Sequence, residues 1–168
     1  VGSISWIIAS VMEGATVPDA AESALGHLAA EPAGDEVTAA LRAALAAAAK
    51  GAPTAERVES LGAGWVAEEA LAIAVYCAAA APDDPRTALL TAVNHSGDSD
   101  STGAICGNLV GAALGEQALP ADWLRQLEGY DLVSQVADDL VTEFGRTAAG
   151  TDPRGADTED WLNRYPGN

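Results

Sequence analysis

The sequence predicts an all-α fold, a compact bundle of several helices with no strand. Apolar residues make up 49% of the chain, but aromatic residues only 5%, so Ala and Leu supply most of the apolar surface. Alanine is the strongest helix former, and its small side chain lets helices pack closely. The apolar residues do not alternate as in strands, and helices joined by short loops favour a bundle.

Nine helical segments are expected, and several carry a start or stop signal. Pro18 falls in a first turn after Thr16, and Thr54 is placed to cap a short helix. Lys50 and Gly51 end an alanine-rich segment. In chain order the predicted helices are Ser3–Glu13, Pro18–Ala30, Asp35–Lys50, Thr54–Leu61, Trp65–Ala81, Pro85–Val93, Ser101–Leu114, Pro120–Leu127 and Tyr130–Phe144.

The chain length bounds the domain organisation. A sequence of 168 residues has room for one domain with a substantial core. We expect a helical domain over residues 1–147. Residues 148–168 contain Gly150, Pro153 and Gly155 and are expected to form a polar C-terminal tail.

Charge and cysteine content exclude several classes of function. The net charge of −17 disfavours binding to nucleic acid or to an anionic membrane, because such binders carry basic patches. No signal peptide and no apolar run of membrane-spanning length is visible, so we expect a cytoplasmic protein without a membrane partner. Cys77 and Cys106 lie in apolar helical runs and are expected to behave as small hydrophobic residues.

The most informative feature is the cluster Asp98-Ser99-Asp100-Ser101, at the point where the loop Asn94–Asp100 is expected to become a helix. Hard divalent cations prefer oxygen ligands, and Mg²⁺ is usually held by one or two carboxylates together with water. Behind the cluster, glycines recur at four-residue spacing and therefore share one helix face, along which another helix can approach closely. They are Gly103, Gly107, Gly111 and Gly115.

The same cluster has two further interpretations, an EF-hand calcium loop and a helix cap. Asp98, Asp100 and Gly103 match positions one, three and six of an EF-hand loop, but position twelve, which needs a bidentate Glu, is Leu109. The EF-hand is therefore rejected. The structural alternative is helix capping, and we expect Asp100 or Ser101 to cap the helix that follows.

Three segments together resemble a known family. Residues 93–115, which contain His-Ser-Gly-Asp-Ser-Asp-Ser-Thr-Gly, are similar to the C-terminal signature of the ADP-ribosylglycohydrolases. Residues 61–76 and 160–167 resemble further blocks of that family. The resemblance implies an all-α enzyme with two Mg²⁺ ions, for which Mn²⁺ is the alternative, that cleaves the bond at C1 of the distal ribose of ADP-ribose. It also implies that Asp98, Asp100 and Ser101 are metal ligands.

The resemblance further implies substrate contacts. Gly64 and Trp65 align with a loop that contacts the nucleotide end of the substrate, and Gly97 lies in the signature itself. His95 adjoins the ligands and either touches substrate or is a loop histidine hydrogen-bonded to the backbone. Trp65 either stacks on the nucleotide or is buried packing. Glu68, near the same loop, is either functional or a first-turn acid favoured by the helix dipole.

One part of the family pattern is absent from this sequence. The family places a Thr-Asp-Asp or Ser-Asp-Asp ligand block in its N-terminal half, and residues 1–92 contain neither. Asp83-Asp84 follows a proline in a turn, and Asp138-Asp139 is expected on a solvated helix face. We therefore expect the remaining ligands and the general base on a missing N-terminal half or a separate partner chain.

The expected function is Mg²⁺-dependent hydrolysis of the ribosyl C1 bond of an ADP-ribosylated protein, with release of ADP-ribose. The Asp-Ser-Asp-Ser-Thr-Gly form favours ADP-ribosylarginine as the linkage. The alternative is a non-catalytic helical module that binds ADP-ribose or metal, or that is purely structural.

Overall fold

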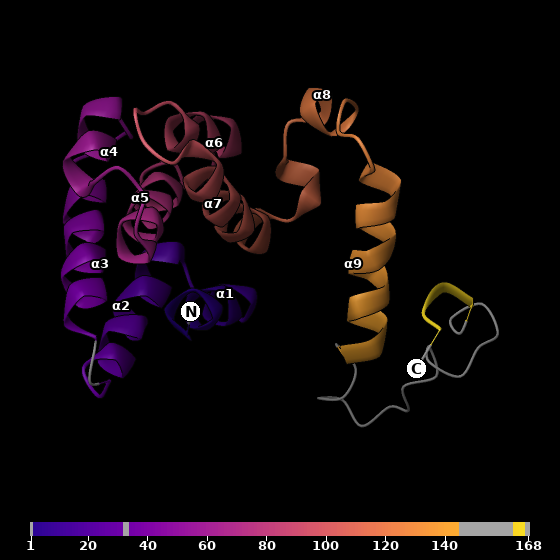
Figure 1. Cartoon of the computed structure of the whole chain (residues 1–168), viewed down its shortest axis with the longest axis horizontal. Coiled ribbons are helices and arrows are strands. Elements are labelled where there is room, and N and C mark those ends of the chain that lie inside the picture. The colour runs from indigo at the N-terminus through magenta and orange to yellow at the C-terminus, as the bar shows by residue number, and fades with distance from the viewer. Residues whose placement is uncertain (1, 32–33, 145–162, 167–168) are drawn as a thin grey trace. The chain divides into compact units, whose positions relative to one another are not determined.

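The computed structural model describes residues 2–31, 34–144 and 163–166. Contacts within the chain divide it into two compact units, residues 1–121 and residues 122–168 (Figure 1). Each unit is described by itself below. The domain boundary predicted between residues 147 and 148 lies outside the described residues, as does most of the predicted tail.

The part of the chain that the structure describes contains nine α-helices, one short 3₁₀ helix and no strand, which confirms the predicted fold class. The first unit holds α1 (Gly2–Met12), α2 (Val17–Leu28), α3 (Asp35–Ala48), α4 (Ala55–Leu61), α5 (Ala67–Ala80), α6 (Pro85–Val93), α7 (Ser99–Leu114) and the 3₁₀ helix η1 (Glu116–Ala118). The short helix α8 (Ala121–Leu124) begins at the boundary between the units, and α9 (Tyr130–Phe144) lies in the second unit.

Helix α5 is the centre of the first unit. It packs against α2, α3, α4, α6 and α7, and Figure 1 shows it between α3 and α7. Every residue from Ala70 to Ala78 is buried, as expected for a helix that is apolar on all sides. The hydroxyl of the fully buried Tyr76 accepts a hydrogen bond from the backbone N–H of Thr54 at 2.9 Å. This bond ties the central helix to the start of α4.

Short polar side chains begin three helices of this unit. The hydroxyl of Thr16 accepts from the N–H of Asp19, and that of Thr54 accepts from the N–H of Arg57. Asp84 accepts from the N–H of Thr87. Each bond satisfies an N–H group that has no partner within its helix. The predicted capping role of Thr54 is thus confirmed, whereas the caps formed by Thr16 and by Asp84, predicted only as a turn residue, were not predicted.

Two helix starts near the candidate site differ from the prediction. Helix α5 begins at Ala67 because the backbone of Val66 is extended, with φ −118° and ψ 152°, so Trp65 lies in the loop that follows the positive φ of Gly64. Helix α7 begins at Ser99, two residues earlier than predicted, because the N–H of Thr102 already bonds to the carbonyl of Asp98. Asp100 and Ser101 therefore lie in the first helical turn.

Helix α8 is shorter than the predicted segment 120–127. The N–H groups of Gln126 and Leu127 bond three residues back, to Trp123 and Leu124. Such bonds form tight turns rather than a continued α-helix.

Helix α6 approaches α7 along the first half of the predicted glycine face. A Cβ at Gly103 would lie 2.6 Å from a methyl group of Val93, and one at Gly107 would lie 3.8 Å from Leu89. At Gly111 and Gly115 an added Cβ would meet no atom within 4 Å. The predicted close approach of a second helix is therefore confirmed at Gly103 and does not extend to Gly111 and Gly115.

An ion pair that the sequence did not predict joins two described residues of the second unit. Arg164 donates two hydrogen bonds of 3.1 Å to the carboxylate of Asp139, and the Tyr165 hydroxyl donates a third. The Asp139 side chain is only 14% exposed, so its prediction as a solvated residue is wrong, whereas Asp138 is exposed as predicted. Among the described residues, no helix is long and apolar enough to cross a membrane.

Candidate functional site

The fold brings two of the three sequence blocks into direct contact at the start of α7. The backbone N–H of Asp98 donates a 2.7 Å hydrogen bond to the carbonyl of Ala63. The approach is so close that a Cβ at Gly97 would overlap the carbonyl group of Ala63. A Cβ at Gly64 would lie 2.8 Å from a methyl carbon of Thr102. Glycine is required at both positions, because any side chain would separate the loop from the helix.

The side chain of Glu69, in the first turn of α5, holds the other side of this loop. One carboxylate oxygen, Oε2, accepts from the N–H groups of both Ala63 and Gly64 at 3.0 Å. The sequence predicted a functional alternative only for the neighbouring acid, Glu68, and the role of Glu69 was missed. The signal that could have found Glu69 is the preceding Gly62-Ala-Gly64 turn, whose N–H groups need an acceptor once the turn is packed against other residues.

His95 is held by a chain of hydrogen bonds. Its Nδ1 accepts from the N–H of Gly97 at 3.1 Å, so in the neutral ring the proton is on Nε2, which donates to the Thr102 hydroxyl at 2.9 Å. The buried Thr102 hydroxyl in turn donates to the carbonyl of Ala92 at 2.7 Å. The alternative in which His95 is a backbone-bonded loop histidine is thus seen directly, and both ring nitrogens have partners.

The three predicted metal ligands lie within one turn at the start of α7. Asp98 occupies the N-cap position, so the expectation that Asp100 or Ser101 caps the helix is wrong. Asp98 and Ser101 are half-buried and Asp100 is exposed. Hydrogen bonding with the Asp100 side chain, and then with Ser101, holds the pKa of the Asp98 carboxyl below its usual value. Although Asp98 is at the N-cap position, its side chain makes no capping hydrogen bond to a backbone N–H group of the first turn.

The donor set fits a hard divalent cation in part. Two carboxylates and a hydroxyl are the oxygen ligands that Mg²⁺ accepts, and Mg²⁺ usually keeps several waters. Within the described ranges, no three His, Cys, Asp or Glu side chains converge on one point. Asp98, Asp100 and Ser101 could therefore supply part of a coordination sphere, and the rest would come from water or from another segment.

Ser96, in the loop before Asp98, adds a contact to α4. Its N–H donates a 2.9 Å hydrogen bond to Oε1 of the exposed Glu59 on α4, and its hydroxyl donates one of 2.9 Å to Oε2 of the same residue. Bonding from the Ser96 N–H, and then from its hydroxyl, lowers the pKa of the Glu59 carboxyl. The loop before Asp98 is thus tied to α4 as well as to α7.

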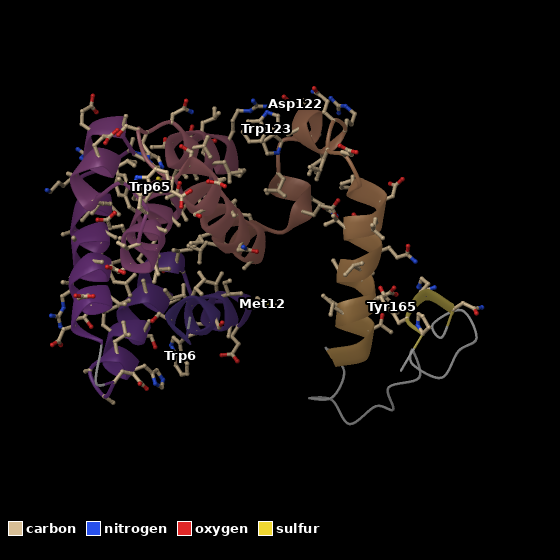
Figure 2. The ribbon with its side chains drawn as sticks, viewed as in Figure 1. Trp6, Met12, Trp65, Asp122, Trp123 and Tyr165 are labelled. Atoms are coloured by element: carbon tan, nitrogen blue, oxygen red, sulfur yellow. The ribbon has the colours of Figure 1, made fainter. Side chains whose placement is uncertain are left out.

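Trp65 projects from the loop that contacts Asp98. Its side chain is 72% exposed, so the alternative of a buried packing residue is wrong (Figure 2). The contrast with Trp6 is informative, because Trp6 packs its ring against His27 and donates to Ser23. An exposed indole in the loop that bonds to the Asp98 main chain offers a flat apolar surface to a ligand.

Comparison with known proteins identifies the family of this chain. The sequence profile of the ADP-ribosylglycohydrolases matches residues 2–150, which include every candidate residue described above. The chain belongs to the ADP-ribosylglycohydrolase family. The family resemblance is thereby confirmed, and the blocks 61–76 and 93–115 lie within the matched residues, whereas the block 160–167 lies outside them.

Two curated relatives give the family match more detail. ADP-ribosyl-[dinitrogen reductase] glycohydrolase of Rhodospirillum rubrum is 41% identical over 46 residues, which cover 27% of this chain and 16% of that relative. ADP-ribosylhydrolase ARH3 of Bos taurus is 28% identical over 102 residues, which cover 55% of this chain and 28% of that protein. The matched part of this chain thus spans less than a third of either relative, and no solved structure matches it.

Proposed function

We propose that this ADP-ribosylglycohydrolase chain takes part in Mg²⁺-dependent hydrolysis of the ribosyl C1 glycosidic bond of ADP-ribosylated proteins, with ADP-ribosylarginine as the linkage. Asp98, Asp100 and Ser101 would hold one side of a site for two Mg²⁺ ions, which Mn²⁺ could replace. The names of both curated relatives describe hydrolysis of ADP-ribosyl groups, which supports the reaction class.

The observation that carries the proposal is the hydrogen bond between the Asp98 N–H and the Ala63 carbonyl. It places the Gly64-Trp65 loop, the candidate contact for the nucleotide, beside the candidate ligands for metal. A substrate that carries both a nucleotide and a ribose next to the scissile bond would need these two features close together. The contact between the loops supplies that proximity.

The chemistry follows from the charge that develops on the sugar. Cleavage at C1 of a ribose passes through a cation-like transition state. Mg²⁺, when bound, orients the ribose hydroxyls and positions the attacking water. The carboxylates of Asp98 and Asp100 would hold the cation, and the Ser101 hydroxyl would add a neutral oxygen donor. A metal ion would also offset the charge of −17 that otherwise repels the diphosphate of the substrate.

The roles of the loop residues are part of the proposal. Trp65 would stack on the base or ribose, and the backbone at Gly64 and Gly97 would approach the substrate closely. His95 would act through the loop, since both of its ring nitrogens already have partners. The general base and the remaining metal ligands would come from an N-terminal segment or a partner chain outside these 168 residues.

One finding favours a second candidate function, a non-catalytic module that binds ADP-ribose or metal. Over the ranges that the structure describes, no third acidic, histidine or cysteine side chain joins Asp98 and Asp100. A chain with an incomplete ligand set could still bind a nucleotide at the Trp65 loop. Such a module would dock on another chain without turning over substrate.

Release of ADP-ribose distinguishes these functions. The assay uses a protein modified on arginine and a second one modified on serine, each with Mg²⁺ or with EDTA. The chain is tested alone and joined to its presumed N-terminal half. Release that requires Mg²⁺ and both halves, and that is faster with the arginine linkage, is the expected result. Binding of ADP-ribose without release in any form would instead support the non-catalytic module.

A further inference from the structure

The loop Gly62–Trp65 has two attachments, one on each side. Toward α7, the Ala63 carbonyl accepts from the Asp98 N–H at 2.7 Å. Toward α5, the N–H groups of Ala63 and Gly64 both donate to Glu69 Oε2 at 3.0 Å. The peptide groups of Ala63 therefore link the carboxylate of Glu69 to the main chain of a candidate metal ligand.

The surroundings make Glu69 the residue that sets the position of the loop. Gly62 has a φ of +126°, and a Cβ there would lie 2.6 Å from Glu69 Cγ, so the loop wraps closely around this side chain. Gly64 is buried, and a buried N–H without an acceptor carries a desolvation penalty. The loop thus keeps this conformation only while an acceptor sits at the position of Glu69 Oε2.

We propose that Glu69 is a positioning residue that holds the Gly62–Trp65 loop against the start of α7 and thereby fixes Asp98 for metal binding. Glu69 itself touches neither metal nor substrate in this scheme. It acts through the peptide groups of Ala63, and its loss would release both Asp98 and the exposed Trp65 side chain. The inference rests on the metal site proposed above.

The neighbouring residue Glu68 provides a matched control. It carries the same charge in the same first turn of α5, and it makes no hydrogen bond to the described part of the chain. A purely electrostatic effect of an acid in the first turn would appear in both variants. An effect that depends on the two hydrogen bonds would appear only at Glu69.

The test uses the full ¹⁵N-labelled chain with the variants Glu69→Ala, Glu69→Asp, Glu69→Gln and Glu68→Ala. Hydrogen exchange of the Asp98 amide reports the bond to Ala63, which Glu69 does not itself make. Line broadening of the Asp100 and Ser101 amide signals during a Mn²⁺ titration reports metal binding. Circular dichroism checks that each variant is folded, and Glu69→Asp, whose carboxylate is one methylene shorter, serves if Glu69→Ala does not fold.

We expect Asp98 exchange to accelerate by about tenfold or more in Glu69→Ala and Glu69→Asp, a change that corresponds to the loss of one net hydrogen bond. The Mn²⁺ concentration at half-broadening should rise by about tenfold in the same variants, as for other groups that orient a metal ligand. Glu69→Gln, which keeps an acceptor oxygen, should restore both properties, and Glu68→Ala should change neither.

Unchanged Asp98 exchange in both folded variants would overturn the inference, and so would faster exchange with an unaltered Mn²⁺ titration. Absence of Mn²⁺ broadening in the unsubstituted chain would overturn the proposed metal site, and with it the part of the inference that concerns metal. The Asp98 exchange rates would then still decide whether Glu69 holds the loop, so the two failures remain distinguishable.

Discussion

The two ends of α7 differ in what holds them in place. At the N-terminal end, backbone and side-chain hydrogen bonds join the helix to the loop before α5 and to His95. The C-terminal end borders an apolar pocket of about 270 Å³. That pocket is lined by Gly14, Ala15, Thr16, Val17, Pro18, Ala78, Pro82, Asp83, Val110, Ala113 and Leu114.

This difference shows how one helix can serve both stability and function. Burial of apolar surface stabilises a helix but is non-directional, so it tolerates small shifts. Hydrogen bonds have narrow distance and angle requirements and fix a main chain to within fractions of an ångström. The candidate ligands lie at the end where position is fixed by hydrogen bonds. The four predictions below test this contrast, from the largest expected effect to the smallest.

The largest effect is expected for Asp100→Ala. In the complete protein, loss of this carboxylate should reduce Mg²⁺-dependent release of ADP-ribose by more than about 100-fold, beyond the range for groups that only orient a ligand. The helical circular dichroism should survive, because Asp100 is exposed. Asn108→Ala, another exposed position on α7, is the control and should keep its activity. Full activity of Asp100→Ala would remove this residue from the ligand set.

Substituting alanine for a glycine near each end of α7 should change the free energy of unfolding in opposite directions. Gly97→Ala should lower the free energy of unfolding by about 3 kcal/mol, because its Cβ would overlap the Ala63 carbonyl group and the backbone cannot move aside cheaply. Gly111→Ala should raise it by about 0.5–1 kcal/mol, since its Cβ meets no atom within 4 Å and alanine favours the helix. Urea unfolding measures both, and a destabilised Gly111→Ala would contradict the contrast.

The buried hydroxyl of Thr102 tests the polar network at the site. Thr102→Val keeps the shape but leaves His95 Nε2 and the Ala92 carbonyl without this partner, which should cost about 1–2 kcal/mol of unfolding free energy. Thr91→Val is the matched control, because the Thr91 hydroxyl bonds only within its own helix. Equal losses in the two variants would show that the network adds no stability beyond an ordinary helix-surface bond.

The smallest effect concerns two buried thiols, Cys106 in the middle of α7 and Cys77 on the adjoining helix α5. Burial raises the pKa of Cys106 to about 12, and burial together with the nearby Cys106 raises the pKa of Cys77 well above its ordinary 9.0. Above pH 9 the unfolded chain loses these protons while the folded chain keeps them. Stability should therefore fall as pH rises, by at most about 1.4 kcal/mol per pH unit for each thiol.

The control for the pH effect is the double variant Cys77→Ala with Cys106→Ala. Its free energy of unfolding, measured by urea titration between pH 8 and 9.5, should fall less steeply than that of the unsubstituted chain. Parallel pH profiles would mean that the thiols do not govern this change. Both thiols should also resist alkylation at pH 8 until urea is added, because the thiolate is the reactive form.

Much of the fold was predictable because local rules decide it. Thr54 caps its helix as its residue type predicts, and α5 is buried as its apolar composition predicts. The prediction was less accurate for the first residues of α5 and α7, the two helices that begin at the site. The positive φ of Gly64 and the early first bond of α7 depend on the contact between two loops that are distant in sequence. No local pattern encodes such a contact.

The sequence by itself determined the family, the all-α class and the cluster of Asp98, Asp100 and Ser101, because short-range helix propensity and a compact motif carry that information. Only the tertiary structure decided that Glu69, rather than Glu68, holds the loop beside Asp98, and that Trp65 is exposed. The physical reason is that adjacent acids have the same local propensity. Their roles differ only through backbone groups that folding brings within hydrogen-bond distance.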